Sequence, residues 1–354
     1  MKSRVCLVLV LLPQAALADD PLRLRLESAA GIDSNITRRE DAAQTGGPLM
    51  RLVLDAADEL RQGSALLGVE YHAGARHFPE HSAEDGVFQS LSGRLVWAPV
   101  AWLAVGLQAR LQDRTTRDSA DPQDHARVQG GPQVDLRLDA WRLSLAGIAS
   151  RLAYKPDADF SADGLGATAT LARSLGRWRA EARVGWLRHT FDGDRLALAG
   201  TGPEGAPFLV PVGGEHREDT LRSGSLGLHH GGDWLAGLEY SVAGNASNSF
   251  RAGHVRHLVR ATTTLELPFE VVASAQLDLQ RVLYDDPQFI TLDTFIEDEN
   301  RSSFKLRLER PLSERWSAVG HLGVWFSPFG GGPGYDRQLA LLGLACNLED
   351  PEQR

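Results

Sequence analysis

The sequence predicts an all-β chain folded as a transmembrane, antiparallel, up-and-down β-barrel of about sixteen strands, within a range of about 14–18. Three observations support this fold class. Apolar and polar residues alternate along many segments, the connections between these segments are alternately short and long, and no apolar run of helix length follows the N-terminal leader. A tilted strand of about ten residues is long enough to cross a bilayer.

The clearest alternation lies in residues 255–283, VRHLVRATTTLELPFEVVASAQLDLQRVL. Every odd position from Phe269 to Leu279 is apolar, whereas the even positions include Gln276 and Asp278. A period of two is typical of a strand with one apolar and one polar face. The Pro268 turn separates two such strands, so this stretch predicts an antiparallel hairpin.

The first eighteen residues, MKSRVCLVLVLLPQAALA, have two early basic residues, a short apolar run and a final Ala-Leu-Ala. We expect residues 1–18 to be a cleaved signal peptide, because the apolar run is too short for a membrane anchor. Residues 19–354 then form a single barrel domain. Cleavage would remove Cys6 and leave Cys346 as the one thiol, so no intramolecular disulfide is expected.

The predicted strands share the alternating pattern and follow one another without a linker or a change in composition. They are 21–31, 48–57, 64–76, 87–97, 100–112, 126–138, 141–154, 163–173, 177–190, 220–230, 233–244, 254–267, 268–283, 302–311, 315–327 and 336–348. Short connections such as 98–100 and 311–314 alternate with long polar ones such as 191–219 and 284–301. Short periplasmic turns and long outer loops distinguish outer-membrane barrels from soluble sandwiches.

This asymmetry predicts a location in the cell outer membrane, with outer-membrane lipid, lipopolysaccharide and the barrel-assembly machinery as partners. An aromatic residue lies near the start of most strands that follow a short turn. Amphipathic rings gathered at one rim are typical of an interfacial girdle, although packing in a core is the alternative. The predicted periplasmic girdle is Trp102, Trp141, Trp178, Trp234, Phe269 and Trp316.

Charged residues on the strands indicate a basic lumen. In strand 177–190 the apolar positions face one way and Arg179, Glu181 and Arg183 face the other, and charges on the lipid face would cost about 2–4 kcal/mol each near the midplane. Basic residues outnumber acidic ones at such positions, although the chain has a formal charge of −9. The predicted lumen-lining basic residues are Arg94, Arg110, Arg127, Arg137, Arg142, Arg177, Arg179, Arg183, Arg256, Arg260, Lys305 and Arg307. Either these charges pair with acids on neighbouring strands, or their excess attracts anions.

Three loops are candidate sites. The longest, 191–219, carries apolar patches that predict inward folding as a constriction, an extra hairpin above the membrane or contact with a partner. The acidic segment 284–301 is either solvated or a holder of a divalent cation, and the glycines at 330–334 fit a flexible loop. The histidines are scattered, so we expect no enzyme activity, no metal site and no cofactor. No stacking aromatics interleave with the basic residues, so no nucleic-acid partner is expected either.

The stretch LRLESAAGIDSNITRRED at 24–41 resembles the opening of two groups of barrel domains. One group is surface-protein translocators with periplasmic helical repeats, and the other is barrel proteins of exopolysaccharide export systems. No helical repeat precedes the first strand here, which favours a porin or a polysaccharide-export barrel. The latter resemblance implies a periplasmic polysaccharide-export component as partner. The last strand departs from such barrels, because it ends at Cys346-Asn347-Leu348 and not in an aromatic residue.

The sequence therefore predicts a non-enzymatic channel that passes a polar, anionic solute or a polysaccharide across the outer membrane. The alternative is a plugged structural or interaction barrel, or a surface-protein translocation barrel, that acts through its outer loops. A ladder of lumen arginines would favour transport, whereas complete pairing with lumen acids would favour a plugged barrel.

Overall fold

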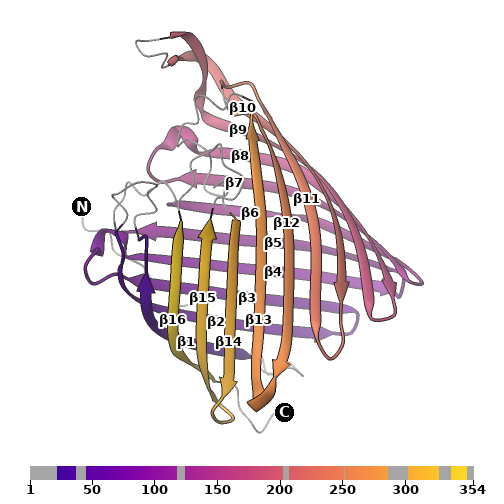
Figure 1. The fold of residues 1–354 in the computed structure, drawn as a ribbon. Helices are drawn as coiled ribbons and strands as arrows, with labels where there is room; N and C mark the ends of the chain where they lie inside the picture. Colours follow the sequence, from indigo (N-terminus) through magenta and orange to yellow (C-terminus); the bar gives the residue numbers. More distant parts are fainter. Residues whose placement is uncertain are drawn as a thin grey trace.

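The computed structural model describes residues 22–36, 45–117, 124–201, 207–250, 252–285, 302–326 and 336–348. Within these ranges sixteen strands form one closed antiparallel barrel, in which each strand pairs with its neighbours in sequence and β1 pairs with β16 (Figure 1). The predicted fold class and strand number are thus confirmed. No helix among the described residues is long and apolar enough to span a membrane.

The strands of the first half are β1 (Arg23–Asp33), β2 (Gly47–Gln62), β3 (Ala65–His77), β4 (Gly86–Val100), β5 (Leu103–Thr116), β6 (His125–Leu138), β7 (Trp141–Tyr154) and β8 (Ala162–Leu175). Those of the second half are β9 (Trp178–Thr201), β10 (Pro207–His230), β11 (Leu235–Ser247), β12 (His254–Leu267), β13 (Val271–Tyr284), β14 (Ser302–Pro311), β15 (Trp316–Phe326) and β16 (Arg337–Asn347). Three short 3₁₀ turns lie between strands in the described residues, namely η1 (Ser82–Glu84), η2 (Ala158–Phe160) and η4 (Pro268–Glu270).

Turns at one rim are tight. The connections 63–64, 139–140 and 176–177 each join two strands, and Gly63 and Gly176 have positive φ angles of 58° and 63°. Glycine adopts such angles without steric cost, so the chain can reverse in two residues. Connections at the opposite rim, such as 34–46 and 285–301, are longer. The predicted segregation of short and long connections is therefore correct.

Several strand boundaries differ from the prediction, two of them at short turns. The sequence predicts a turn in the polar stretch 55–63, but β2 continues through it and pairs with β3 as far as Gln62 opposite Ala65. Its charged residues Asp55 and Glu59 bind His72 and Arg94 across the strands, so they belong to the polar face of a strand. The strand predicted from residue 268 begins at Val271, because Pro268–Glu270 is a 3₁₀ turn with φ of 66° at Phe269.

The described residues of segment 191–219 do not fold into the lumen, so the first of the three predicted alternatives is wrong. β9 and β10 continue through it as one long hairpin that rises past the neighbouring strands at the top of Figure 1. Its apolar patches pair with each other, with Leu209 opposite Leu198 and Val210 opposite Ala197. The extra hairpin, one of the predicted alternatives, is what forms, because cross-strand pairing buries part of the apolar surface.

Removing residues 196–211 is expected to leave the open-pore conductance unchanged, because the projecting hairpin lies beyond the barrel wall. The measurement is single-channel conductance in planar bilayers, with heat-modifiable migration of the barrel on a gel as the folding control. A higher conductance of the shortened variant would show that the hairpin covers the lumen after all.

The outer surface of the barrel is apolar. Large exposed side chains alternate along the strands, for example Leu107, Leu165, Leu226 and Leu342, which are 57–77% exposed. All six predicted girdle aromatics are exposed and lie at one rim, at or just before the starts of β5, β7, β9, β11, β13 and β15. Rings at the boundary of an apolar band suit the membrane interface. The other face of each strand therefore lines the lumen.

Candidate functional site

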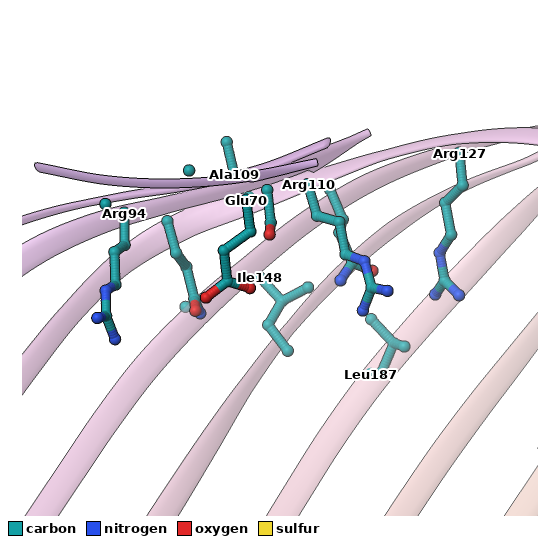
Figure 2. Close-up of a pocket in the computed structure, with 14 residues that line it drawn as sticks. Glu70, Arg94, Ala109, Arg110, Arg127, Ile148 and Leu187 are labelled. Atoms are coloured by element: carbon teal, nitrogen blue, oxygen red, sulfur yellow. The ribbon is translucent and has the colours of Figure 1, made fainter. Parts of the chain in front are cut away.

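A staircase of three arginines climbs one wall of the lumen. Arg94 lies on β4, Arg110 on β5 and Arg127 on β6. Arg110 is opposite Ser92, and Arg127 is opposite Gln112, so each arginine stands two residues nearer the long-loop rim than the one before it. We call these three residues the arginine staircase. Figure 2 shows their guanidinium groups reaching from the wall into the same space.

A hollow of about 410 Å³ in the lumen wall is lined by the arginine staircase. Glu70 on β3 supplies a carboxylate to this hollow, and Ile148 and Leu187 supply apolar surface facing the arginines (Figure 2). Three cations against one carboxylate make the hollow basic. A low-dielectric wall focuses such charge, so the potential in the hollow favours anions.

The staircase arginines differ in how they are held. Arg94 binds Glu59 on β2 in a salt bridge, which neutralises part of its charge. The Nε of Arg110 donates a hydrogen bond to Ser90 Oγ at 3.1 Å, and no carboxylate among the described residues pairs with it. A hydroxyl orients a guanidinium without cancelling its charge. Arg110 therefore keeps a full positive charge available to a passing ion.

Other predicted lumen residues are paired with acids, as the alternative interpretation expected. Arg142 Nη2 lies 2.9 Å from Asp135 on the neighbouring strand, and Arg260 Nε lies 2.7 Å from Asp278. Arg179 and Arg183 share Glu181, at 2.8 and 3.0 Å. The one-to-one pairs of Arg142 and Arg260 contribute little net charge. Arg179 and Arg183 share one carboxylate, so one positive charge remains between them.

The remaining predicted residues occupy different places. Arg177 lies in the short turn before β9, 3.6 Å from Asp233, so it stands at the rim and not on the strand wall. Arg137 lies one residue from the end of β6, opposite Arg142. Arg256 and Lys305 alternate with outward Val255 and Phe304, which places them on the inner face of β12 and β14.

A second charge cluster links the first strands of the chain to the last ones, where the barrel closes. Glu27 on β1 is 3% exposed and accepts from Arg51 at 2.6 Å, from Arg307 at 2.9 Å and from His321 at 2.8 Å. Glu309 binds Arg307 and Arg25, both at 2.9 Å. We call this set the seam cluster, because β1 and β2 meet β14 and β15 across the β1–β16 pairing. Of its members only Arg307 was among the predicted site residues.

An apolar cluster, not foreseen from the sequence, covers part of the lumen wall at the long-loop rim. It contains Ala29, Ile36, Leu49, Phe78 and Leu341, all at most 5% exposed. Ile36 and Phe78 follow β1 and β3 and fold back over the inward side chains of β1, β2 and β16. We call it the mouth cluster. Its loop residues Ile36 and Phe78 therefore lie on the lumen side of the wall, next to the seam.

Polar contacts hold the mouth cluster in place. The backbone N–H of Phe78 donates to Asp85 Oδ1 at 2.8 Å, and the N–H of Ile36 donates to Thr45 O at 2.8 Å. Beside it the Nε of Arg337 donates to Asp33 at 2.9 Å, and its guanidinium lies 4.8 Å from the Trp325 ring centroid. These hydrogen bonds satisfy polar groups at the cluster, and they stabilise the inward fold of the residues that follow β1 and β3.

Replacing Phe78 by alanine is expected to raise the single-channel conductance, because the ring is 1% exposed and fixes the inward fold of the loop after β3. It should also lower the free energy of unfolding by about 3 kcal/mol. Conductance in planar bilayers and urea unfolding check the two effects, with Phe208→Ala on the exposed outer hairpin as the matched control. An unchanged conductance would show that the mouth cluster does not limit the pore.

No group of three or more His, Cys, Asp or Glu side chains arranged to hold a metal ion occurs in the described parts of the chain. The acidic residues 286–301, the glycines at 330–334 and the predicted signal peptide at 1–18 lie outside the described residues.

No protein-family model and no curated protein matches this chain. Among solved structures, OccK2 (OpdF) of Pseudomonas aeruginosa is similar, with a TM-score of 0.50, 11% identity and coverage of 94% of this chain and 100% of that one. A BenF-like porin from Pseudomonas fluorescens Pf-5 has a TM-score of 0.48 and 10% identity, covering 94% and 100%. A bacterial polysaccharide outer membrane secretin has a TM-score of 0.45 and 9% identity, covering 94% and 99%.

Only the first of these likenesses reaches a TM-score of 0.50, and at 11% identity it shows the fold alone. That fold is the closed antiparallel outer-membrane β-barrel. It agrees with the closed barrel and the apolar outer surface described above, and with the predicted location in the cell outer membrane.

Proposed function

We propose that this chain is a channel that conducts small polar anions across the cell outer membrane, with the arginine staircase as its transport path. The observation that carries the proposal is the position of Arg110, which lines the basic hollow and is bound by a hydroxyl and by no described carboxylate. Successive cations spaced along the pore let an anion move from one to the next without leaving a favourable potential. No catalytic step is part of this function.

The proposal favours a small anion over a polysaccharide. The mouth cluster occupies part of the lumen at the long-loop rim, and its side chains are at most 5% exposed. A wall packed in this way leaves less room for a polymer than for a small ion. A periplasmic polysaccharide-export partner is accordingly no part of the proposed function, whereas outer-membrane lipid, lipopolysaccharide and the assembly machinery remain proposed partners.

The test is the zero-current potential of the refolded protein in a planar bilayer under a tenfold gradient of potassium chloride. A steady conductance supports the proposal if its zero-current potential has the sign of the equilibrium potential of chloride. A non-selective or cation-selective conductance contradicts the role of the staircase, and the absence of any conductance above the bare bilayer contradicts the channel.

A plugged structural or interaction barrel is the second candidate, and one observation favours it. The mouth cluster covers one side of the lumen wall with buried apolar groups, and the seam cluster beside it pairs its charges around the buried Glu27. If the loops close the remaining side, the barrel conducts no ions and acts through its outer surface. The bilayer measurement separates the two candidates, because a plugged barrel gives no steady current.

A further inference from the structure

The lipid-facing side of β10 to β13 carries three basic residues near the long-loop rim. Arg222 lies on β10, His257 on β12 and Arg281 on β13. They share their faces with the exposed outer residues Leu226, on β10, and Leu283, on β13. His257 is directly opposite Arg281, and Arg222 is opposite Gly244, whose neighbour on β12 is Val255. We call these three residues the outer basic patch.

The outer basic patch lies near the outer edge of the apolar band. Arg222 is about eight residues from His230, where β10 ends at the short-turn rim, which is about 26 Å along the strand and about 20 Å along the membrane normal. The apolar band of such barrels is about 25 Å tall. A cation there costs far less than at the midplane, and its long side chain can reach the headgroups.

Other outward cations near this rim are neutralised by the protein itself. Arg151 lies 3.5 Å from Asp163 and also binds Asp192, and Arg188 lies 2.7 Å from Glu218. Arg222 and Arg281 are exposed, and no carboxylate in the described part of the chain pairs with either. Two charges facing lipid without an internal partner call for an anion from outside the protein.

His257 is oriented to donate a hydrogen bond to an anion outside the barrel. The Tyr240 hydroxyl lies 2.8 Å from Nδ1 of His257, and the two rings stack with centroids 6.2 Å apart. When the hydroxyl donates to Nδ1, the proton of the imidazole lies on Nε2, which becomes a hydrogen-bond donor. The patch then presents two guanidinium groups and one N–H, which are donors that phosphate oxygens accept.

Apolar surface lies below the outer basic patch, toward the short-turn rim. Leu226 is 64% exposed, Leu238 is 56% exposed and Val259 is 36% exposed. The wall therefore has cations at headgroup level and aliphatic side chains at acyl-chain level. This is the complement of a lipid that has an anionic phosphate head and several acyl chains.

We propose that the outer basic patch binds a phosphate group of the lipid A part of lipopolysaccharide in the outer leaflet. Arg222 and Arg281 hold the phosphate, His257 donates to it from Nε2, and the acyl chains lie on the aliphatic surface below. The site is on the outside of the barrel, so it does not depend on the lumen being a channel.

The experiment is titration of the detergent-solubilised barrel with bisphosphorylated lipid A, read by native mass spectrometry. The variant Arg222→Gln/Arg281→Gln is expected to weaken lipid A binding at least about tenfold, because it removes both charges facing the phosphate. Arg151→Gln is the matched control, since this outward cation is already paired, and its binding should change less than about twofold. Single-channel conductance should be the same in all three proteins.

Two outcomes would overturn the proposal. One is equal lipid A binding by the double variant and the parent protein, when both show the same heat-modifiable migration of a folded barrel. The other is equal binding of dephosphorylated lipid A, which would show that the acyl chains alone are recognised. Inorganic phosphate at millimolar concentration should not displace the lipid, because the aliphatic surface contributes to binding, and displacement would assign the site to free phosphate.

Discussion

Replacing Arg110 and Arg127 by glutamine is expected to lower the chloride-over-potassium permeability ratio by about three- to tenfold. Both side chains line the basic hollow, and their removal leaves only the Glu70 carboxylate and Arg94, which is itself bound to Glu59, as charges of the hollow's lining. The zero-current potential in a potassium chloride gradient should therefore move toward zero or to the cation side. The single-channel conductance in chloride should fall with it, because fewer anions enter the pore.

The matched control for this prediction is Arg260→Gln combined with Asp278→Asn. It removes a lumen arginine together with the carboxylate that lies 2.7 Å from it, so the net charge of the lumen is unchanged. Its permeability ratio should stay within about twofold of the parent value. If both double variants shift the potential equally, the shift does not come from the positive charge of the staircase, and the staircase has no special part in transport.

The fold could be predicted from the sequence because three patterns agree. Apolar and polar residues alternate, short and long connections alternate, and aromatic residues lie at the starts of strands. Strand β7 was predicted with the boundaries that it has, residues 141–154, since its apolar positions alternate and an aromatic begins it. Strand β2 was cut short, because Asp55, Asp58 and Glu59 look like turn residues when their cross-strand partners are unknown. A period of two says which residues share a face, but not where pairing with the next strand stops.

The candidate site was predicted only in part. The alternation of side chains along a strand places Arg110 and Arg142 on the inner face, and this can be inferred without knowing which residues lie on the neighbouring strands. Whether each charge is cancelled depends on register, which puts Ser90 beside Arg110 and Asp135 beside Arg142. Register between strands is a tertiary property, so the sequence could not separate the staircase from the paired arginines.

The mouth cluster could not be foreseen for a related reason. Ile36 and Phe78 are single apolar residues in otherwise polar loops, and such residues carry no periodic signal. Their burial depends on the loops after β1 and β3 packing against Leu341 of β16, which is distant from them in sequence. The same closure brings Glu27 beside Arg307 and His321, which are far from it along the chain.

Replacing Glu27 by glutamine is expected to lower the free energy of unfolding by about 3 kcal/mol. The carboxylate is buried and accepts from Arg51, Arg307 and His321. An amide cannot neutralise the two guanidinium groups, so their charges would stay close together without the carboxylate that lies between them. Urea unfolding of the barrel in lipid vesicles, followed by tryptophan fluorescence, measures the change.

Asp55→Asn is the control for this prediction, because its carboxylate also binds a histidine across strands but is 49% exposed. Water screens an exposed pair, so the control should cost less than about 1 kcal/mol. Glu27 differs from Asp55 in one further respect, since its partners lie on β2 and on β14 and β15, at the two ends of the chain. Its replacement should therefore loosen barrel closure itself and lower the temperature at which the heat-modifiable band is lost, and equal effects of the two substitutions would show that the seam cluster does not secure closure.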